Sequence, residues 1–252
     1  MKIDINSDLG ESFGNYKIGN DAKVMKYISS ANIACGLHAG DPVVIENTIK
    51  LALENKVGIG AHPGYPDLQG FGRRSMKLNL DEIRSTVLYQ VAALKSMTEA
   101  LGGKLQHVKA HGALYNDAAI NKEIATAIAK AVLQIDPELI FMGLANSVMI
   151  EAAQDLGLKT ANEVFADRAY TKFGTLVSRS LPDSVIHDGE VCNHRVLKMI
   201  QEQKVTEIEG SEISIQADSI CIHGDNPTAI EMAKSLKNHL KKNRITIQAL
   251  KK

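Results

Sequence analysis

Residues 29–42, SSANIACGLHAGDP, contain the unit from which we expect the fold to be built. Ala31–Ala34 is a short apolar run of the kind found in strands that are buried on both faces. Gly and His residues follow it, and Asp41-Pro42 places a capping side chain directly before a proline at the first helical position. The stretch therefore predicts a strand, a polar loop and the start of a helix.

Similar short runs recur along the chain and alternate with longer amphipathic stretches. The expected strands are Ile3–Ile5, Ala31–Ala34, Val57–Ala61, His107–Ala110, Leu139–Leu144, Leu158–Ala161 and Ile220–Ile222, with a further candidate near Leu176–Arg179. Among the helices, Asn79 and Glu82 predict a capping-box start, Gly102-Gly103 predicts the end of that helix, and Asn226-Pro227 repeats the pattern of Asp41-Pro42.

Polar motifs follow nearly every expected strand, which favours a closed barrel over an open doubly wound sheet with one switch point. We predict an α/β fold: an irregular, TIM-like (β/α) barrel of about seven parallel strands. Residues 1–252 are expected to form a single domain, because no linker or low-complexity tract divides them. Alternation around Gly210 predicts a β-hairpin inserted near residues 204–216.

Composition excludes several classes of function. The 252 residues carry 29 basic and 29 acidic side chains, no Trp, and only 4% aromatic residues. This balance provides neither a basic surface for nucleic acid or membrane nor a stacking platform for bases. No signal-like or membrane-spanning apolar segment and no CxxC pair occur in the sequence, so we expect a cytoplasmic protein.

Strand ends concentrate the unusual residues, in six stretches: residues 6–11, 32–41, 60–67, 109–116, 162–168 and 223–227. The C-terminal ends of barrel strands surround one mouth, so these stretches are expected to converge. Four histidines recur in this context, at positions 38, 62, 111 and 223, and such a set predicts proton transfer or metal ligation. His107, His187, His194 and His239 lack this context and are interpreted as surface or structural residues.

Two local patterns add detail to this expected mouth. Arg73 and Arg74, in GFGRR, supply guanidinium groups that suit a carboxylate or phosphate. Strand alternation sends Lys109 and His111 to the same side, and the nearby cation is then expected to lower the pKa of His111. The sequence has no P-loop, dinucleotide fingerprint, GxSxG elbow or HExxH motif.

Together these stretches resemble the family of 5-oxoprolinase A subunits, also described as the lactam-utilisation or YcsF-like family. The resemblance rests on IDINSDLGESFG (3–14), SSANIACGLHAGDP (29–42), GAHPGYPDLQGFGRR (60–74), VKAHGALYN (108–116), EVFADRAY (163–170) and ICIHGDNP (220–227). It implies a barrel similar to glycoside hydrolase/deacetylase barrels. It also implies ATP-dependent opening of the 5-oxoproline (pyroglutamate) lactam to L-glutamate, with ATP cleaved to ADP and phosphate, alongside partner subunits B and C.

On this basis each candidate residue receives a role. Asp8, His38, His62, Lys109 and His111 are the expected catalytic residues, with Lys109 also able to hold an anion. The expected substrate-binding residues are Asn32, Arg73, Arg74, Glu163, Asp167, Arg168, His223 and Asp225. ATP is the expected co-substrate of the complex, and the sequence leaves open whether it touches this chain.

Two alternatives remain open at this stage. One is a metal-dependent deacetylase or amidohydrolase in which Asp8, His38 and His62 hold a divalent metal. The other is a non-catalytic barrel that carries or senses a small ligand.

Overall fold

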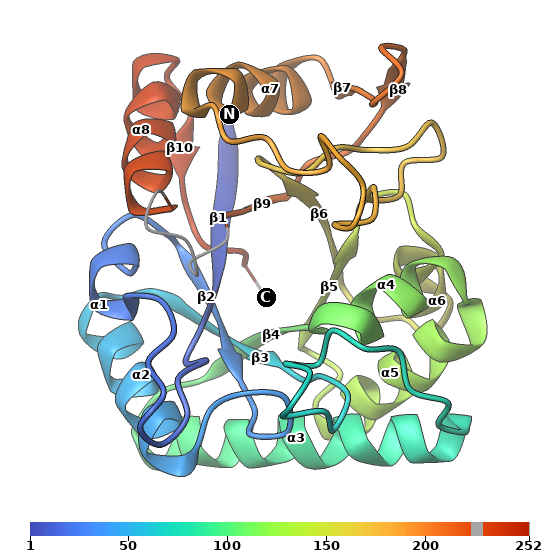
Figure 1. The fold of residues 1–252 in the computed structure, drawn as a ribbon. Coiled ribbons are helices and arrows are strands. Elements are labelled where there is room, and N and C mark those ends of the chain that lie inside the picture. The colour runs from blue at the N-terminus through green and yellow to red at the C-terminus, as the bar shows by residue number, and fades with distance from the viewer. Residues whose placement is uncertain (223–228, 252) are drawn as a thin grey trace.

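The computed structural model describes residues 1–222 and 229–251, and the expected helix start at Asn226-Pro227 lies outside them. Within the described residues, parallel strands close into a barrel in the order β1 (Lys2–Leu9), β2 (Ser30–Ala34), β3 (Gly58–His62), β4 (Leu105–Lys109), β5 (Ile140–Leu144), β6 (Thr160–Phe165) and β9 (Ser219–Cys221). The ring closes because β9 pairs with β6 on one side and with β1 on the other (Figure 1). This confirms the predicted TIM-like barrel.

Helices surround the barrel on its outside (Figure 1). They are α1 (Asp21–Val24), α2 (Pro42–Glu54), α3 (Leu80–Ala100), α4 (Gly112–Ile120), α5 (Lys122–Ile135), α6 (Val148–Asp155), α7 (Gly189–Gln201) and α8 (Ala229–Lys242). None of the described helices combines the length and the apolar character needed to cross a bilayer.

Local capping signals in the sequence correspond to observed helix ends. The Asp41 side chain accepts hydrogen bonds from the backbone N–H groups of Val43 and Val44, directly ahead of Pro42. Asn79 and Glu82 form a reciprocal capping box at the start of α3. These interactions confirm the two expected helix starts. Both starts could be predicted from the sequence because each cap involves only residues within one helical turn.

The barrel interior is unusually polar. Asn6 donates to Ser219 Oγ at 2.8 Å, and Asn32 donates to Asn6 Oδ1 at 2.7 Å. His107 Nε2 lies 2.7 Å from Asn32 Oδ1, a contact between β4 and β2, which are not neighbours in the sheet. Contacts between such strands cross the interior, so the barrel holds a connected polar network instead of purely apolar layers.

Three segments refine the sequence-based expectations. Leu176–Arg179, expected as a strand, lies in the long loop between β6 and α7 and has only an isolated bridge from Leu176 to Tyr170. It does not join the barrel, because the edge of β6 on that side is already paired with β9. The sixth strand begins later than the expected Leu158–Ala161 and runs over Thr160–Phe165. β7 (Lys204–Thr206) and β8 (Glu212–Ser214) pair antiparallel, while the short β10 (Thr246–Ile247) pairs parallel with the first residues of β1.

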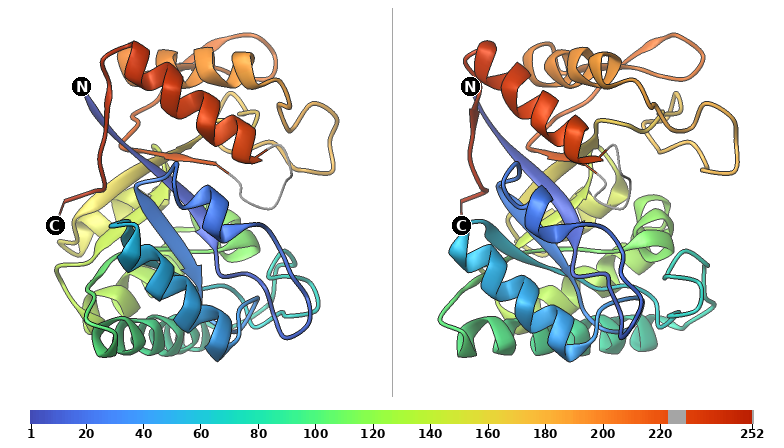
Figure 2. Two further views of the ribbon diagram at one scale, coloured as in Figure 1. Left: turned by 90° about the vertical axis from the view of Figure 1, so that its left-hand side faces the viewer. Right: turned by 60° about the vertical axis from the view of Figure 1, so that its left-hand side comes forward.

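The loops that follow the strands gather at one end of the barrel. In the left view of Figure 2 both chain ends lie on one side, and the long loops after β1, β3 and β6 lie on the opposite side. The polar stretches that the structure describes, at residues 6–11, 32–41, 60–67, 109–116 and 162–168, therefore share one face of the molecule.

Candidate active site

A cavity of about 510 Å³ opens at the loop-bearing end of the barrel. Its walls include most of the ionisable residues discussed below: Asp8, Glu11, His62, Arg73, Lys109, His111, Tyr115, Arg168 and Arg179. Apolar groups such as Leu144 and Phe165 line another part of it. This combination of a concave pocket and a few convergent polar groups is typical of a small-molecule site.

Lys109, at the end of β4, is the centre of the charged network. Its Nζ lies 2.9 Å from Asp8 Oδ1 and 2.7 Å from Glu163 Oε1, and it donates to Asn6 Oδ1 at 3.2 Å. Burial opposes the charge on Lys109, but Asp8 and Glu163 raise its pKa well above the usual value. The ammonium group therefore remains protonated at neutral pH.

Glu163 is completely buried on β6 and is held from two sides. The Tyr115 hydroxyl donates to its Oε2 at 2.7 Å, while Lys109 contacts its other oxygen. Burial and the neighbouring Glu163 carboxylate raise the pKa of Tyr115 well above its usual value. Tyr115 thus stays neutral and presents its phenol at the cavity wall.

His62 and His111 meet edge to face, with ring centroids 4.8 Å apart. His62 Nε2 lies 2.9 Å from His111 Nδ1, and 3.3 Å from Asp8 Oδ2. The remaining ring nitrogens face backbone carbonyls: His62 Nδ1 lies 2.8 Å from Lys109 O, and His111 Nε2 lies 2.8 Å from Phe71 O.

His38 lies behind this pair and is fully buried. Its ring stacks on His111 at a centroid distance of 3.8 Å and an interplanar angle of 8°. Neither ring nitrogen of His38 has a hydrogen-bond partner among the described residues. Burial, followed by the neighbouring His111 and His62, lowers the pKa of His38 well below its usual value, so the ring is neutral.

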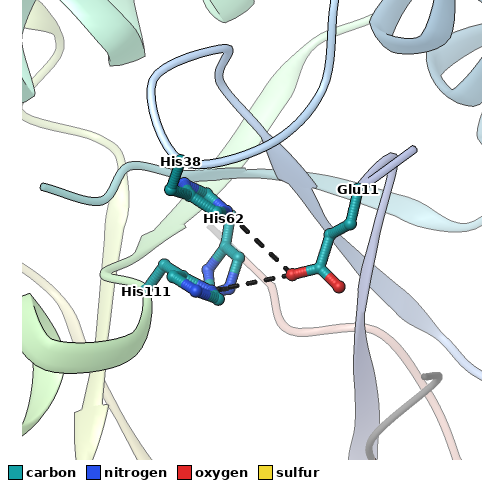
Figure 3. A group of neighbouring side chains, drawn as sticks. All are labelled: Glu11, His38, His62 and His111. Atoms are coloured by element: carbon teal, nitrogen blue, oxygen red, sulfur yellow. Dashed lines mark hydrogen bonds and ion pairs between the residues drawn. The ribbon is translucent and has the colours of Figure 1, made fainter. Parts of the chain in front are cut away.

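Glu11 completes the group and was not among the expected site residues. Its Oε1 lies 3.6 Å from His111 Nδ1 and 4.0 Å from His38 Nε2 (Figure 3). Ligand atoms of Glu11, His38, His62 and His111 all lie within 4.8 Å of one another, so these residues could hold a metal ion. The sequence signal for Glu11 was its place at the end of the NSDLGE stretch.

The pKa of His111 is lowered to about 3, in the expected direction but for a different reason. Burial is the largest cause and the neighbouring His62 ring is the next. Lys109 does not act on His111 as expected, because its ammonium group points across the barrel to Asp8 and Glu163.

The two arginines of the GFGRR stretch occupy different environments. Arg73 lines the cavity, and its guanidinium lies 5.0 Å from the centre of the Phe71 ring. Arg74 instead pairs with Asp67 through two nitrogens, which ties the loop together outside the cavity wall. Arg168 also lines the cavity, and its Nη2 donates to Val177 O at 2.6 Å in the loop after β6.

The other expected substrate-binding residues are placed less directly. Asn32 is buried beneath Asp8 and donates to its Oδ1 at 2.8 Å, so it orients that carboxylate from outside the cavity wall. Asp167 lies in the loop after β6, where its carbonyl accepts a hydrogen bond from the Ile186 N–H, and it does not line the cavity. His223 and Asp225 lie outside the described residues.

Fold and cavity together define a β/α-barrel protein with a buried cluster of histidines and carboxylates at the mouth of the barrel. The LamB/YcsF family profile matches residues 3–252, and the chain belongs to this family. The A subunit of the 5-oxoprolinase from Campylobacter jejuni is 56% identical over 99% of this chain and 98% of its own length. These matches confirm the resemblance found in the sequence.

Solved structures show the same architecture. The lactam utilization protein from Thermus thermophilus superposes with a TM-score of 0.94 and 43% identity, covering 99% of this chain and 100% of that protein. A family 4 carbohydrate esterase from Streptomyces lividans superposes with a TM-score of 0.51 at 8% identity, covering 99% of this chain and 93% of that one. The second likeness concerns the barrel fold alone.

Proposed function

We propose that this chain is the A subunit of a 5-oxoprolinase and contributes the lactam-binding site of that enzyme. The observation that carries this proposal is the full-length, 56% identity to a protein named as the A subunit of 5-oxoprolinase. The proposed net reaction consumes 5-oxoproline, ATP and water and yields L-glutamate, ADP and phosphate.

The cavity chemistry supports this assignment. A five-membered lactam carries an unreactive amide, and phosphorylation of its carbonyl oxygen by ATP would activate the ring carbon toward attack by water. Cleavage of the ring C–N bond, with a proton delivered to the departing nitrogen, would open the ring to an acyl phosphate. A second water would then hydrolyse this acyl phosphate to L-glutamate and phosphate. The buried Lys109 ammonium holds the carboxylates of Asp8 and Glu163, and we assign it to orienting Asp8 at the cavity wall. Arg73 and Arg168 line the cavity, and we assign them to the substrate carboxylate or the phosphate.

Proton transfer is assigned to the Asp8, His62 and His111 group, all of which line the cavity. Asp8 Oδ2 lies 3.3 Å from His62 Nε2, which is within reach of a shared water or proton. His38 lies outside the cavity wall, so we assign it to holding the His111 ring by stacking.

The sequence contains no P-loop and no dinucleotide fingerprint, which fits a reaction in which a partner subunit binds the nucleotide. We therefore assign ATP to the assembled enzyme with its B and C subunits. The test is release of glutamate from 5-oxoproline and ATP by this chain alone and in the presence of both partners. Release only from the complete mixture is the expected result, whereas robust release by the isolated chain would contradict the division of labour.

A second candidate function is metal-dependent hydrolysis of a small amide or acetylated sugar. It is favoured by the buried cluster of Glu11 and three histidines. Acetate release from N-acetylated sugars by the isolated chain, without ATP, would favour this candidate. Absence of such release, together with ATP-dependent glutamate formation in the mixture, would eliminate it.

A further inference from the structure

Two backbone carbonyls determine which nitrogens of His62 and His111 carry hydrogen. A carbonyl oxygen can only accept, so Lys109 O requires a proton on His62 Nδ1, and Phe71 O requires one on His111 Nε2. In the neutral rings, the opposite nitrogens are then both unprotonated. These two nitrogens, His62 Nε2 and His111 Nδ1, are the pair that face each other at 2.9 Å.

Two lone pairs at this distance repel unless a positive charge lies between or beside them. Glu11 adds a carboxylate oxygen 3.6 Å from His111 Nδ1, on the same group of side chains (Figure 3). We propose that His62 Nε2, His111 Nδ1, Glu11 Oε1 and His38 Nε2 bind one divalent transition-metal ion.

The spacing of these atoms fits such an ion. Zinc–nitrogen and zinc–oxygen bonds of about 2.0–2.2 Å place neighbouring tetrahedral ligands about 3.3–3.6 Å apart. The observed separations of 2.9, 3.6 and 4.0 Å lie on both sides of this range. The four ligand atoms lie within 4.8 Å of one another, so binding of a tetrahedral ion would draw the more distant of them closer together.

His38 provides the independent observation. An imidazole that is fully buried with neither nitrogen bonded among the described residues carries an uncompensated desolvation cost. Its Nε2 lies 4.0 Å from Glu11 Oε1, and His38 belongs to the group whose ligand atoms all lie within 4.8 Å of one another. A bound ion would offset the cost of burying it.

The donor set also selects the class of ion. Three imidazoles and one carboxylate suit zinc and its transition-metal neighbours, whereas magnesium and calcium prefer oxygen ligands. Asp8, considered as a metal ligand in the sequence, is bonded through Oδ1 by Lys109 and Asn32, while its Oδ2 lies 3.3 Å from His62 Nε2 beside the proposed ligand set. The carbonyls of Lys109 and Phe71 act as the outer partners that orient metal-bound histidines.

When bound, such an ion would supply Lewis acidity at the mouth of the cavity, where Glu11, His62 and His111 form part of the wall. The inference concerns the same cavity as the proposed oxoprolinase reaction. The ion would occupy the His62 and His111 nitrogens to which that reaction assigns proton transfer, so in the metal-bound chain this task falls to Asp8. Metal binding by the isolated chain can nevertheless be measured without ATP, 5-oxoproline or partner subunits, so either proposal can fail while the other survives.

The experiment titrates the chelator-treated, desalted chain with Zn²⁺ by calorimetry and measures bound metal by mass spectrometry after gel filtration. One Zn²⁺ per chain is expected for the wild type. Glu11→Gln and His111→Asn are expected to weaken binding at least about 100-fold, since loss of outer-shell partners alone costs 10–100-fold. Glu138→Gln and His187→Asn, at exposed positions, are matched controls and should bind like the wild type.

A measurement on the wild type does not depend on variants that fold. Nitrogen-15 spectra of the histidine rings should show the Nδ1–H form of His62 and the Nε2–H form of His111, with Zn²⁺ shifting only their facing nitrogens. A proton shared between the two rings that Zn²⁺ does not displace would overturn the proposal. Substoichiometric binding, or unchanged binding in both cluster variants, would also overturn it.

Discussion

Lys109 and Glu163 form a fully buried ion pair across the barrel, with Nζ 2.7 Å from Oε1, although their strands β4 and β6 are separated by β5. Asp8 contacts the same ammonium from β1. Three strands are thereby linked through one cation at the base of the cavity.

Removing this cation should destabilise the chain strongly. Lys109→Met leaves Asp8 and Glu163 without their counter-charge, and loss of one partner from a buried pair costs about 3–5 kcal/mol of unfolding free energy. Chemical denaturation measures this change. The double variant Lys109→Met/Glu163→Gln should recover part of the loss, and Lys159→Met, from the exposed pair with Glu138, should cost less than about 1 kcal/mol. Equal costs for the two lysine variants would contradict the interpretation.

His111→Asn should separate a chemical role from a structural one. Asparagine retains hydrogen-bonding groups beside Phe71 O but cannot accept a proton near neutral pH. We expect turnover of the three-subunit mixture to fall by about 10²-fold or more, with little change in melting temperature or partner assembly. Near-normal turnover would remove His111 from the mechanism, and a joint loss of turnover and stability would indicate a structural residue.

Arg73 and Arg74 should respond differently to substitution by Met. Arg73 lines the cavity, so loss of a charge-assisted hydrogen bond to an anionic ligand should cost about 1.5–3 kcal/mol in kcat/KM for 5-oxoproline. Arg74 is occupied by Asp67 outside the cavity wall, so its replacement should change kcat/KM much less. Equal effects on kcat/KM would show that the loop acts as a unit.

His107 should make the chain less stable in acid. Burial, with Lys109 next, lowers its pKa to about 3, whereas the unfolded chain has a histidine pKa of about 6.5. As pH falls between these values, only the unfolded state gains this proton, so the unfolding free energy falls by up to about 1.4 kcal/mol per pH unit. His107→Gln should flatten the measured dependence between about pH 6 and 4.5 by about one proton. His187→Gln, at an exposed position, should leave the slope unchanged.

Gly72 should be intolerant of a side chain because the loop after β3 lies against the histidines. An added Cβ would lie 2.8 Å from both His111 Cδ2 and His38 Cβ. Gly72→Ala should therefore cost about 1–3 kcal/mol from overpacking, in addition to backbone strain at φ +62°, and should lower turnover. Gly157→Ala shares a positive φ of 79° but its Cβ meets no described atom within 4 Å, so it reports the strain alone. Similar melting temperatures for the two variants would contradict this close packing.

Much of the architecture could be predicted from short-range patterns. Apolar runs, the Asp41 cap and the Asn79–Glu82 capping box each depend on neighbouring residues, and each corresponds to an observed element. The expected strand at Leu176–Arg179 was wrong because strand formation also needs a free neighbouring edge. That edge was already taken by the pairing of β6 with β9.

The sequence by itself determined the alternation of strands and helices, the family resemblance, and the concentration of histidines and acids after the strands. Tertiary structure alone decided which atoms meet: it directed Lys109 to Glu163, brought Glu11 beside His111, and separated Arg73 from Arg74. The reason is geometric, since periodicity specifies the face on which a side chain lies. Distances across the barrel depend on closure, strand register and loop path, which involve residues far apart in the chain.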